Sequence, residues 1–447
     1  MVRWLFPGIL LPVMKMDSIW KNDGQMPEFP SLEGDLAADV LVIGGGLTGL
    51  LCAWNLTRAG VDCTLIEQNR LMGGVSGRTT AKLTAQHGLI YHKLLKRYGT
   101  DTARLYWQAN RDALDKYREL AKEWDFDLTS QNSYLYATGD TKKLEDEMNA
   151  CRELGIPARW EEKLELPFPV TGAVSFPDQA QFHPMKLAAH LAKNLRIYEK
   201  TKALEFTGDR VRTPGGSIKG KKIIVATHFP LWNKHGGYFL KLYQQRSYVI
   251  ALENAPRVEG MYLDCEDNGL SIRTAGEYLL LGGGGHRTGK TGLNWKLPQA
   301  AGEKYFPQGK IAVRWATQDC MSLDGMPYIG QYSKATPNLY VATGFNKWGM
   351  SSAMAAATIL TDLIQGRENP YSAIFSPQRS ILHRQLLCNG LESTMNLLRP
   401  TVPRCPHLGC ALKWNKEEHS WDCSCHGSRF DEKGRLLNGP ATGDLKK

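Results

Sequence analysis

The sequence lacks any uninterrupted run that approaches the roughly 20 apolar residues needed to span a bilayer, so it predicts no transmembrane segment. It also lacks a concentrated basic run: 55 Lys and Arg against 45 Asp and Glu leave a formal charge of +10, which is spread along the chain. We therefore expect a solvated basic surface and no nucleic-acid partner. Attraction to an acidic redox partner or an anionic membrane is the alternative.

Cysteine is too scarce for a disulfide scaffold, with ten in 447 residues. Four of the ten gather near the carboxyl end. The other six are isolated in ordinary sequence, which indicates a reducing, cytoplasmic location: Cys52, Cys63, Cys151, Cys265, Cys320 and Cys388.

Residues 1–15, MVRWLFPGILLPVMK, mimic a secretion signal. Two prolines interrupt their apolar run and no small-residue cleavage site follows, so we expect neither a signal peptide nor an anchor. Residues 1–36 are predicted to be an N-terminal extension, and Met16 is an alternative to Met1 as the true start. The length of the whole chain predicts two or three domains.

Two short runs near the carboxyl end carry the strongest chemical signal, CPHLGC (405–410) and CSCHGS (423–428). Cys405 and His407 lie two apart, Cys423 and His426 lie three apart, and fifteen residues separate the pairs. Each run offers one thiolate and one imidazole, which is the ligand pattern of a Rieske [2Fe-2S] cluster. Zinc is the rival metal, although zinc fingers usually pair Cys with Cys and His with His.

Both runs resemble the ligand loops of the Rieske proteins of cytochrome bc complexes, and NGPA (438–441) resembles the proline loop that covers their cluster. The resemblance implies a disulfide between Cys410 and Cys425 and a hydrogen bond from Ser428 to a cluster sulfur. It also implies four metal ligands: Cys405, His407, Cys423 and His426. Only residues 405–447 match, and a piece of roughly 40 residues rarely folds without support, so we expect it to dock against the rest of the chain.

Residues 39–67 read as an apolar strand, a glycine turn, an amphipathic helix and a second strand that ends in an acid. This order predicts a dinucleotide-binding βαβ unit. Gly44 makes the tight turn, Gly46 lets the backbone approach a pyrophosphate, and Gly49 lets the helix pack on the strand. Glu67 is placed to bind a ribose hydroxyl. The alternative is a glycine-rich turn that binds no ligand.

Four further segments resemble the FAD-dependent D-amino-acid oxidase and glycine oxidase superfamily: residues 73–88, 221–230, 322–330 and 338–353. The resemblance covers roughly residues 37–375 and implies that FAD is the cofactor. It implies these cofactor contacts: Gly44, Gly46, Leu47, Thr48, Gly49, Glu67, Gln68, Ser76, Arg78, Thr79, Thr80, Thr227, Gly344, Trp348, Gly349 and Met350.

We expect an α/β chain, α+β overall. A Rossmann-like FAD domain (about 37–98, 200–232 and 310–375) is interwoven with a substrate domain (about 99–199 and 233–309) that has a mixed or antiparallel sheet. Helices are expected at 101–125 and 140–154. Residues 376–404 are expected to be a partly helical linker, and 405–447 a small, abbreviated all-β Rieske domain.

Catalytic residues are harder to identify, because flavin amine oxidation is a hydride transfer that requires no fixed acid–base motif. Arg246 and Tyr248 are candidates for binding a substrate carboxylate, and His286 is a third catalytic candidate. Arg287 and Lys347 are further polar candidates. For each of them an ordinary packing or surface role is the alternative.

The chain resembles bacterial fusions of such a flavoprotein with a Rieske domain. This resemblance implies an oxidoreductase that oxidises a small amine or amino-acid-like substrate and relays electrons from FAD to the cluster and on to an unidentified partner. A fused one-electron centre favours a dehydrogenase over an oxidase. Two alternatives stay open: a redox sensor or structural staple whose cluster takes no part in turnover, and a plain oxidase with a vestigial tail.

Overall fold

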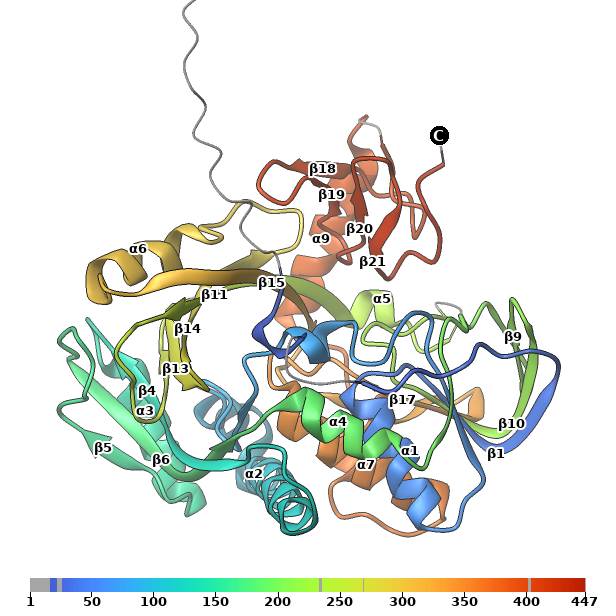
Figure 1. Cartoon of the computed structure of the whole chain (residues 1–447), viewed down its shortest axis with the longest axis horizontal. Coiled ribbons are helices and arrows are strands. Elements are labelled where there is room, and N and C mark those ends of the chain that lie inside the picture. The colour runs from blue at the N-terminus through green and yellow to red at the C-terminus, as the bar shows by residue number, and fades with distance from the viewer. Residues whose placement is uncertain (1–16, 22–25, 233–234, 268, 401–402, 447) are drawn as a thin grey trace, which may run out of the picture.

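The computed structural model describes residues 17–21, 26–232, 235–267, 269–400 and 403–446. The choice between Met1 and Met16 and most of the predicted N-terminal extension lie outside these ranges. Two large sheets and a small carboxyl-terminal lobe form the molecule (Figure 1). This arrangement confirms the predicted α/β class and the small β-rich end of the chain.

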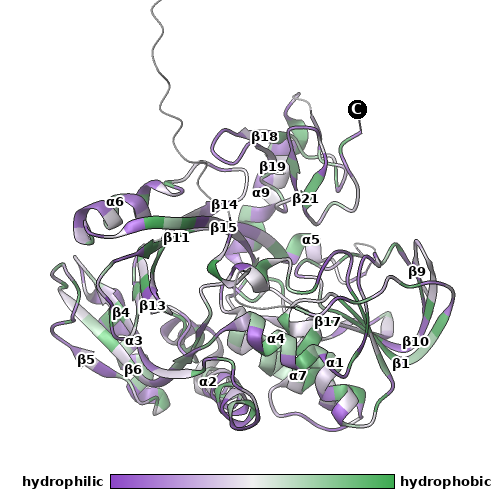
Figure 2. Ribbon diagram, viewed as in Figure 1, coloured by the Kyte–Doolittle hydropathy of each residue, from purple (hydrophilic) through white to green (hydrophobic). Residues whose placement is uncertain are grey.

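The first sheet has a parallel centre, as the βαβ pattern predicts. Its strand order is β16–β17–β10–β1–β2–β7, and only β16 runs antiparallel to its neighbour on this path. The helices α1, α4 and α7 lie together beside this sheet, and α7 is mostly hydrophobic (Figure 2). These elements are β1 (Leu36–Ile43), α1 (Leu47–Arg58), β2 (Cys63–Ile66), α4 (Pro184–Ala192), β7 (Arg196–Tyr198), β8 (Glu205–Thr207), β9 (Arg210–Thr213), β10 (Gly216–Val225), β16 (Tyr328–Ser333), β17 (Thr336–Thr343) and α7 (Gly349–Ile364).

The second sheet is mixed and mainly antiparallel, in the order β15–β11–β14–β13–β12–β4–β6–β3, and only β12 and β4 pair in parallel on this path. The predicted helices are present, but α2 begins ten residues before the expected position and bends at Gly99. The elements are β3 (Lys82–Leu83), α2 (Tyr91–Glu123), β4 (Thr129–Ala137), α3 (Lys142–Leu154), β5 (Arg159–Glu161), β6 (Gly172–Gln181), α5 (Tyr238–Lys241), β11 (Leu242–Glu253), β12 (Met261–Asp264), β13 (Ser271–Ala275), β14 (Tyr278–Arg287), α6 (Lys296–Tyr305) and β15 (Lys310–Ser322).

Two predicted segment boundaries need correction. The segment 310–375, assigned to the FAD domain, begins with β15, which pairs with β11 of the second sheet along its whole length. The segment 99–199, assigned to the substrate domain, ends with β7, which pairs with β2 of the first sheet. An alternating strand pattern shows that a face is buried but not which sheet buries it.

The carboxyl-terminal lobe consists of a helix and a four-stranded antiparallel sheet in consecutive order, and it sits above α5 and β15 (Figure 1). The helix α9 occupies most of the predicted linker. Its elements are α9 (Arg384–Leu398), β18 (Leu412–Asn415), β19 (Ser420–Cys423), β20 (Arg429–Asp431) and β21 (Leu436–Asn438). The connection from α7 passes through the short helix α8 (Ser372–Phe375), and two 3₁₀ turns, Ile19–Lys21 and Val75–Arg78, complete the described elements.

The lobe has a very small hydrophobic core. Four of its seven fully buried members are cysteines, and Leu412, Phe430 and Ala441 are the others. So little apolar burial cannot hold a fold of this size, and the lobe must gain stability from other contacts. Among the described residues, no helix is long and apolar enough to cross a membrane.

We expect Arg379→Ala to lower the free energy of unfolding by about 3–5 kcal/mol, because it leaves a buried carboxylate without its partner. Arg379 binds both oxygens of the fully buried Asp324, through Nε at 2.7 Å and Nη2 at 2.8 Å. Urea unfolding measures the change. Arg367→Ala is the matched control, since its pair with Asp362 lies at the surface and should contribute at most about 1 kcal/mol. Equal effects of the two variants would contradict the prediction.

Candidate functional site

The glycine turn after β1 has the form that a phosphate cradle requires. Gly44 has φ +114°, and a Cβ there would lie 2.5 Å from the carbonyl oxygen of Ala226. A Cβ at Gly49 would lie 1.8 Å from the carbonyl oxygen of Gly44. Gly46 precedes the first residue of α1, so the open end of the helix faces the turn. Larger residues at Gly44 or Gly49 would push the strand, turn and helix apart.

Glu67 stands beside this turn at the end of β2. Its carboxylate accepts hydrogen bonds from the backbone N–H groups of Gly45 and Asn69, both at 2.8 Å. Burial raises the pKa of Glu67, and these two hydrogen bonds partly offset that effect. The hydroxyl of Ser76 accepts a hydrogen bond from the N–H of Leu47 at 3.0 Å, which joins the following loop to the start of the helix.

A cavity of about 2060 Å³ extends from the glycine turn to the carboxyl-terminal lobe. Fifteen of the sixteen predicted FAD contacts line it, and the exception is Gly49, whose small size serves helix packing. The cavity is large enough for a dinucleotide and a small substrate. The close-approach glycines, the open helix end and the acid after β2 all fit FAD.

The cavity is lined by two groups of opposite charge whose proximity the sequence did not predict. Asp319 on β15 and Lys347 in the turn before α7 both line the cavity. Burial raises the pKa of Asp319 and Lys347 partly offsets the rise; burial lowers the pKa of Lys347 and Asp319 partly offsets the fall. A third charged group, Lys82, donates to the carbonyl of Tyr262 and to Ser271, and burial lowers its pKa to about 7.

His87 packs against the predicted flavin contact Trp348. The two rings stack with centroids 4.9 Å apart. The Nδ1 of His87 lies 2.6 Å from the hydroxyl of Tyr106, and its Nε2 lies 2.9 Å from that of Ser351. Burial lowers the pKa of His87 to about 3, so the imidazole is neutral and acts as a fixed wall of the cavity.

The structure brings the three catalytic candidates together at the boundary with the carboxyl-terminal lobe. Arg246 forms a two-point ion pair with Glu418, whose Oε1 accepts from Nε at 3.0 Å. The hydroxyl of Tyr248 lies between Glu418 Oε1, at 2.8 Å, and His286 Nε2, at 3.0 Å. Glu418 also receives Arg429 at 2.9 Å. These contacts assign Arg246, Tyr248 and His286 to an interface, and their catalytic role stays a prediction.

The two cysteine- and histidine-bearing loops face each other in the lobe. The rings of His407 and His426 lie 4.9 Å apart, edge to face. A hydrogen bond from Cys423 lowers the pKa of Cys405, with further help from Ser428 and from the N–H groups of His407 and Leu408. The structure thus pairs the two predicted cysteine ligands with each other and the two predicted histidine ligands with each other, with N–H groups directed at the Cys405 thiol.

Burial keeps both imidazoles neutral, because it lowers the pKa of His407 to about 4 and that of His426 to about 3. Neutral imidazole is the form that binds metal. The Nδ1 of His426 is buried and has no hydrogen-bond partner among the described residues. A buried nitrogen of this kind, beside two thiols and a second imidazole, fits ligation of a [2Fe-2S] cluster.

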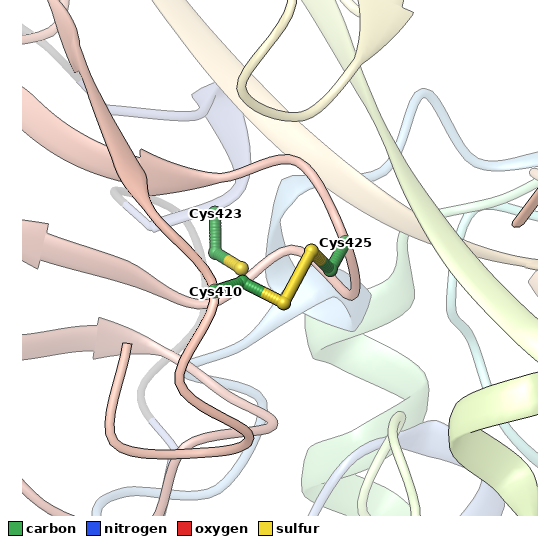
Figure 3. Close-up of side chains that lie close together, drawn as sticks. All are labelled: Cys410, Cys423 and Cys425. Atoms are coloured by element: carbon green, nitrogen blue, oxygen red, sulfur yellow. A yellow bond between two sulfur atoms is a disulfide. The ribbon is translucent and has the colours of Figure 1, made fainter. Parts of the chain in front are cut away.

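The predicted disulfide between Cys410 and Cys425 is present. Figure 3 shows it beside Cys423, and the three sulfur atoms lie within 4.8 Å of one another. Cys410 and Cys425 are bonded to each other, so Cys423 is the one of these three cysteines that can offer a thiolate to a metal. Ser428 accepts a hydrogen bond from the N–H of Ala441 at 3.0 Å, which fixes the proline loop over the site.

Amide side chains from the second sheet hold the second ligand loop by its backbone. Gln244 on β11 donates to the carbonyls of His426, at 2.7 Å, and Gly439, at 3.0 Å. Gln318 on β15 donates to the carbonyl of Gly427 at 2.8 Å and to the side chain of Gln244 at 2.7 Å. A Cβ at Gly427 would lie 2.6 Å from that of Gln244, so only glycine allows this approach.

Two aromatic rings lie against the histidines of the cluster loops. Phe229 follows β10 and lies 6.1 Å from the ring of His407 and 6.5 Å from that of His426. Phe239 lies 6.3 Å from His426. The carbonyl of Phe229 accepts a hydrogen bond from the predicted FAD contact Thr227 at 2.8 Å. One short loop thus contacts both cofactor sites.

Sequence reasoning missed most of this interface. No local pattern distinguishes Gln244, Gln318 or Glu418 from ordinary polar residues of a strand or turn. Phe229 lies within residues 221–230, which resemble the FAD-dependent oxidase superfamily, but no feature of the sequence links it to the cluster. Arg287, a candidate for the substrate, instead donates to the carbonyls of Ser424 and Cys425, both at 2.9 Å.

A family model described as FAD dependent oxidoreductase matches residues 39–363. The chain belongs to this family. A second model, described as Rieske [2Fe-2S] domain, matches residues 392–447 and so begins within α9. The protein is therefore an FAD-dependent oxidoreductase of the D-amino-acid oxidase superfamily with a fused Rieske domain, and its cofactors are FAD and a [2Fe-2S] cluster.

Known proteins resemble this FAD-dependent oxidoreductase in sequence and in fold. A Bacillus subtilis (strain 168) protein that carries the name Rieske 2Fe-2S iron-sulfur protein YhfW is 35% identical and covers 96% of this chain and 97% of its own. The gamma-glutamylputrescine oxidoreductase of Escherichia coli (strain K12) is 26% identical over 77% of this chain and 88% of its own. The glycine oxidase of Geobacillus kaustophilus shares the fold, with a TM-score of 0.66, 20% identity and coverage of 77% of this chain and 100% of that structure.

We expect Gly44→Ala to abolish FAD binding, because the new Cβ would meet the backbone of Ala226 and the backbone conformation disfavours L side chains. The absorbance of flavin relative to protein in the purified oxidoreductase measures the loss, and circular dichroism checks the fold. Gly60→Ala is the control, since Gly60 also has positive φ but nothing lies within 4 Å of its Cβ position. Full FAD content in Gly44→Ala would contradict the prediction.

We expect Glu418→Gln to destabilise the protein at neutral pH by about 3–5 kcal/mol, since it leaves Arg246 buried without its carboxylate and removes one of the two carboxylates that Arg429 binds. Burial alone raises the pKa of Glu418, but the two arginines lower it to about 2, below the ordinary value of 4.5 for a glutamate.

Because the folded pKa is the lower one, this stability is complete above about pH 4.5 and is lost as the pH falls toward 2. The difference between wild type and variant should therefore shrink by about 3 kcal/mol over that range. Urea unfolding at several pH values measures it, and a difference independent of pH would contradict the assignment.

Proposed function

We propose that this protein is an amine or amino-acid dehydrogenase in which two electrons taken from a small substrate at FAD leave one at a time through the Rieske cluster to a one-electron acceptor. The single observation that carries the proposal is that the second cluster loop is hydrogen-bonded to side chains that line the FAD cavity. Gln244 and Gln318 line that cavity and bind the backbone at His426 and Gly427. A cluster that served only as a distant staple would not need this contact.

FAD, when bound, supplies the hydride acceptor. The chain's own residues form the cavity, hold its walls rigid through His87 and Trp348, and present charge near the predicted flavin site. Asp319 and Lys347 offer one anionic and one cationic group, which suits an amine and a carboxylate on one small molecule. We keep Arg246, Tyr248 and His286 as predicted catalytic residues. Glu418 already binds the side chains of Arg246 and Tyr248, so Asp319 and Lys347 are the stronger candidates for binding the substrate.

The named activities of the relatives support the substrate class. The relatives include a gamma-glutamylputrescine oxidoreductase and, by fold, a glycine oxidase and an L-proline dehydrogenase of P. horikoshii. Each name refers to an amine or an amino acid. We also infer a cytoplasmic location, which the buried free thiols of Cys52, Cys63, Cys151, Cys265 and Cys320 support.

We expect anaerobic mixing with an accepted amine to bleach the flavin first and then to produce the EPR signal of the reduced cluster. In His426→Ala, flavin bleaching should persist while transfer to an artificial one-electron acceptor falls at least about tenfold, because one imidazole ligand is missing. His419→Ala is the matched control, an exposed histidine of the same lobe.

Three results would contradict the relay. Flavin reduction with a cluster that stays oxidised would exclude electron transfer between the two sites. Loss of order of the whole carboxyl-terminal lobe in His426→Ala, without a selective loss of transfer, would indicate a structural staple. Peroxide production unchanged by deletion of residues from Cys405 onward would indicate a plain oxidase.

A further inference from the structure

The helix α9 is oriented with its polar side toward the protein. Its buried residues are Asn389 and Asn396, exposed by 4% and 1%. Asn389 accepts from Arg287 at 2.9 Å, and the carbonyl of Asn396 accepts from the N–H of Ala411 at 3.0 Å. The polar face is thus committed to the lobe and to β14, and the apolar face is turned outward.

The outward face is a continuous stripe. Leu387, Leu391, Met395 and Leu398 are exposed by 70%, 67%, 57% and 78%. Their spacing places them within about 80° of arc on a helix of 3.6 residues per turn. An apolar stripe without a covering element is rare on a soluble surface and marks a contact surface.

Exposed apolar side chains concentrate around this helix. Of the twelve large hydrophobic residues that are exposed in the described part of the chain, seven lie between 382 and 408. The three outside the stripe are Leu382, just before α9, Leu397 near its end, and Leu408. Leu408 follows the cluster ligand His407, so the exposed apolar surface reaches the cluster loop.

The charged residues of the segment that carries the stripe are mostly basic. Arg384 begins α9, and Arg399 and Arg404 follow its end, all three exposed. Glu392 is the one acidic residue in the sequence from 384 to 404, and it is paired with Lys290 at 2.5 Å. An apolar helical face flanked by arginines matches a surface that is apolar within and anionic at its border.

We propose that the exposed face of α9, with Leu408, lies on an anionic membrane surface as a peripheral anchor. The helix would rest flat with its leucines among the acyl chains near the headgroups and its arginines against the phosphates. This inference goes beyond the proposed function and stands whether or not the relay operates. A protein partner or a second copy of the chain fits the basic border less well, since neither is required to be anionic.

The test measures binding of the full-length holoprotein to vesicles by cosedimentation. Vesicles of phosphatidylglycerol mixed with phosphatidylcholine should bind the wild type, and pure phosphatidylcholine vesicles should bind it less. The triple variant L387Q/M395Q/L391Q should reduce the partition coefficient at least about tenfold. The double variant R384Q/R399Q should reduce it on the mixed vesicles and weaken its salt dependence.

Two control variants locate the effect. L293Q changes a leucine that is 56% exposed on the loop before α6 and should leave binding unchanged. L10Q/L11Q changes the apolar amino-terminal run and separates its contribution from that of α9. Flavin absorbance and circular dichroism confirm that each variant is folded.

A second measurement needs no substitution. Cys388 borders the stripe and is the exposed one among the described free cysteines. An environment-sensitive fluorophore on Cys388 should shift to shorter wavelength with the mixed vesicles. Three results would overturn the proposal: no binding above that of pure phosphatidylcholine, equal binding by the triple variant, or a dimer that the triple variant dissociates without any vesicle binding.

Discussion

The carboxyl-terminal lobe cannot be held by its own hydrophobic core, and this constraint shapes the interface on which the second site depends. Its fully buried apolar residues are few, and four of them are the cysteines of the cluster site. Polar contacts with the second sheet take the place of a core. Glu418 lies between Arg246 of the sheet and Arg429 of the lobe, and all three side chains are buried.

A buried ion pair of this kind is a poor source of net stability, because desolvation offsets much of the attraction. It is highly sensitive to geometry, however, since a displaced partner leaves a bare charge in the interior. The same holds for the amides of Gln244 and Gln318, whose donors meet carbonyls of the cluster loop. The interface therefore favours one position of the lobe, which is what the proposed relay of electrons would require.

The sequence allowed prediction of those parts that local chemistry determines. The turn at Gly44, the acid Glu67 and the cysteine and histidine pairs each form a pattern within a short stretch, and the structure gathers them as that pattern requires. The disulfide between Cys410 and Cys425 is predicted by the resemblance of the same two loops to those of Rieske proteins, and it is present. Short-range spacing was sufficient because each of these groups is built by one or two neighbouring loops.

Long-range contacts were not predictable. Arg246 is predicted from the sequence to bind a substrate carboxylate, and only the fold shows that a turn 172 residues away supplies Glu418 as its partner. The predicted boundary between the two large domains differs from the division into sheets for a related reason. The strand β15 has an alternating pattern that suits either sheet, and the structure pairs it with β11. A single sequence records which face of an element is buried, but it does not record the partner.

The cluster loops have two chemically different sides, and this difference gives the lobe a direction. His407 and His426 contact Phe229, whose carbonyl binds Thr227 in the FAD cavity. Leu408, the neighbour of His407, is exposed instead. Under the proposed relay, FAD inside the chain and an external acceptor would therefore reach the cluster loops from different sides. Under the proposed relay, a rigidly docked lobe would require such an arrangement, because a fixed centre cannot swing between a donor and an acceptor.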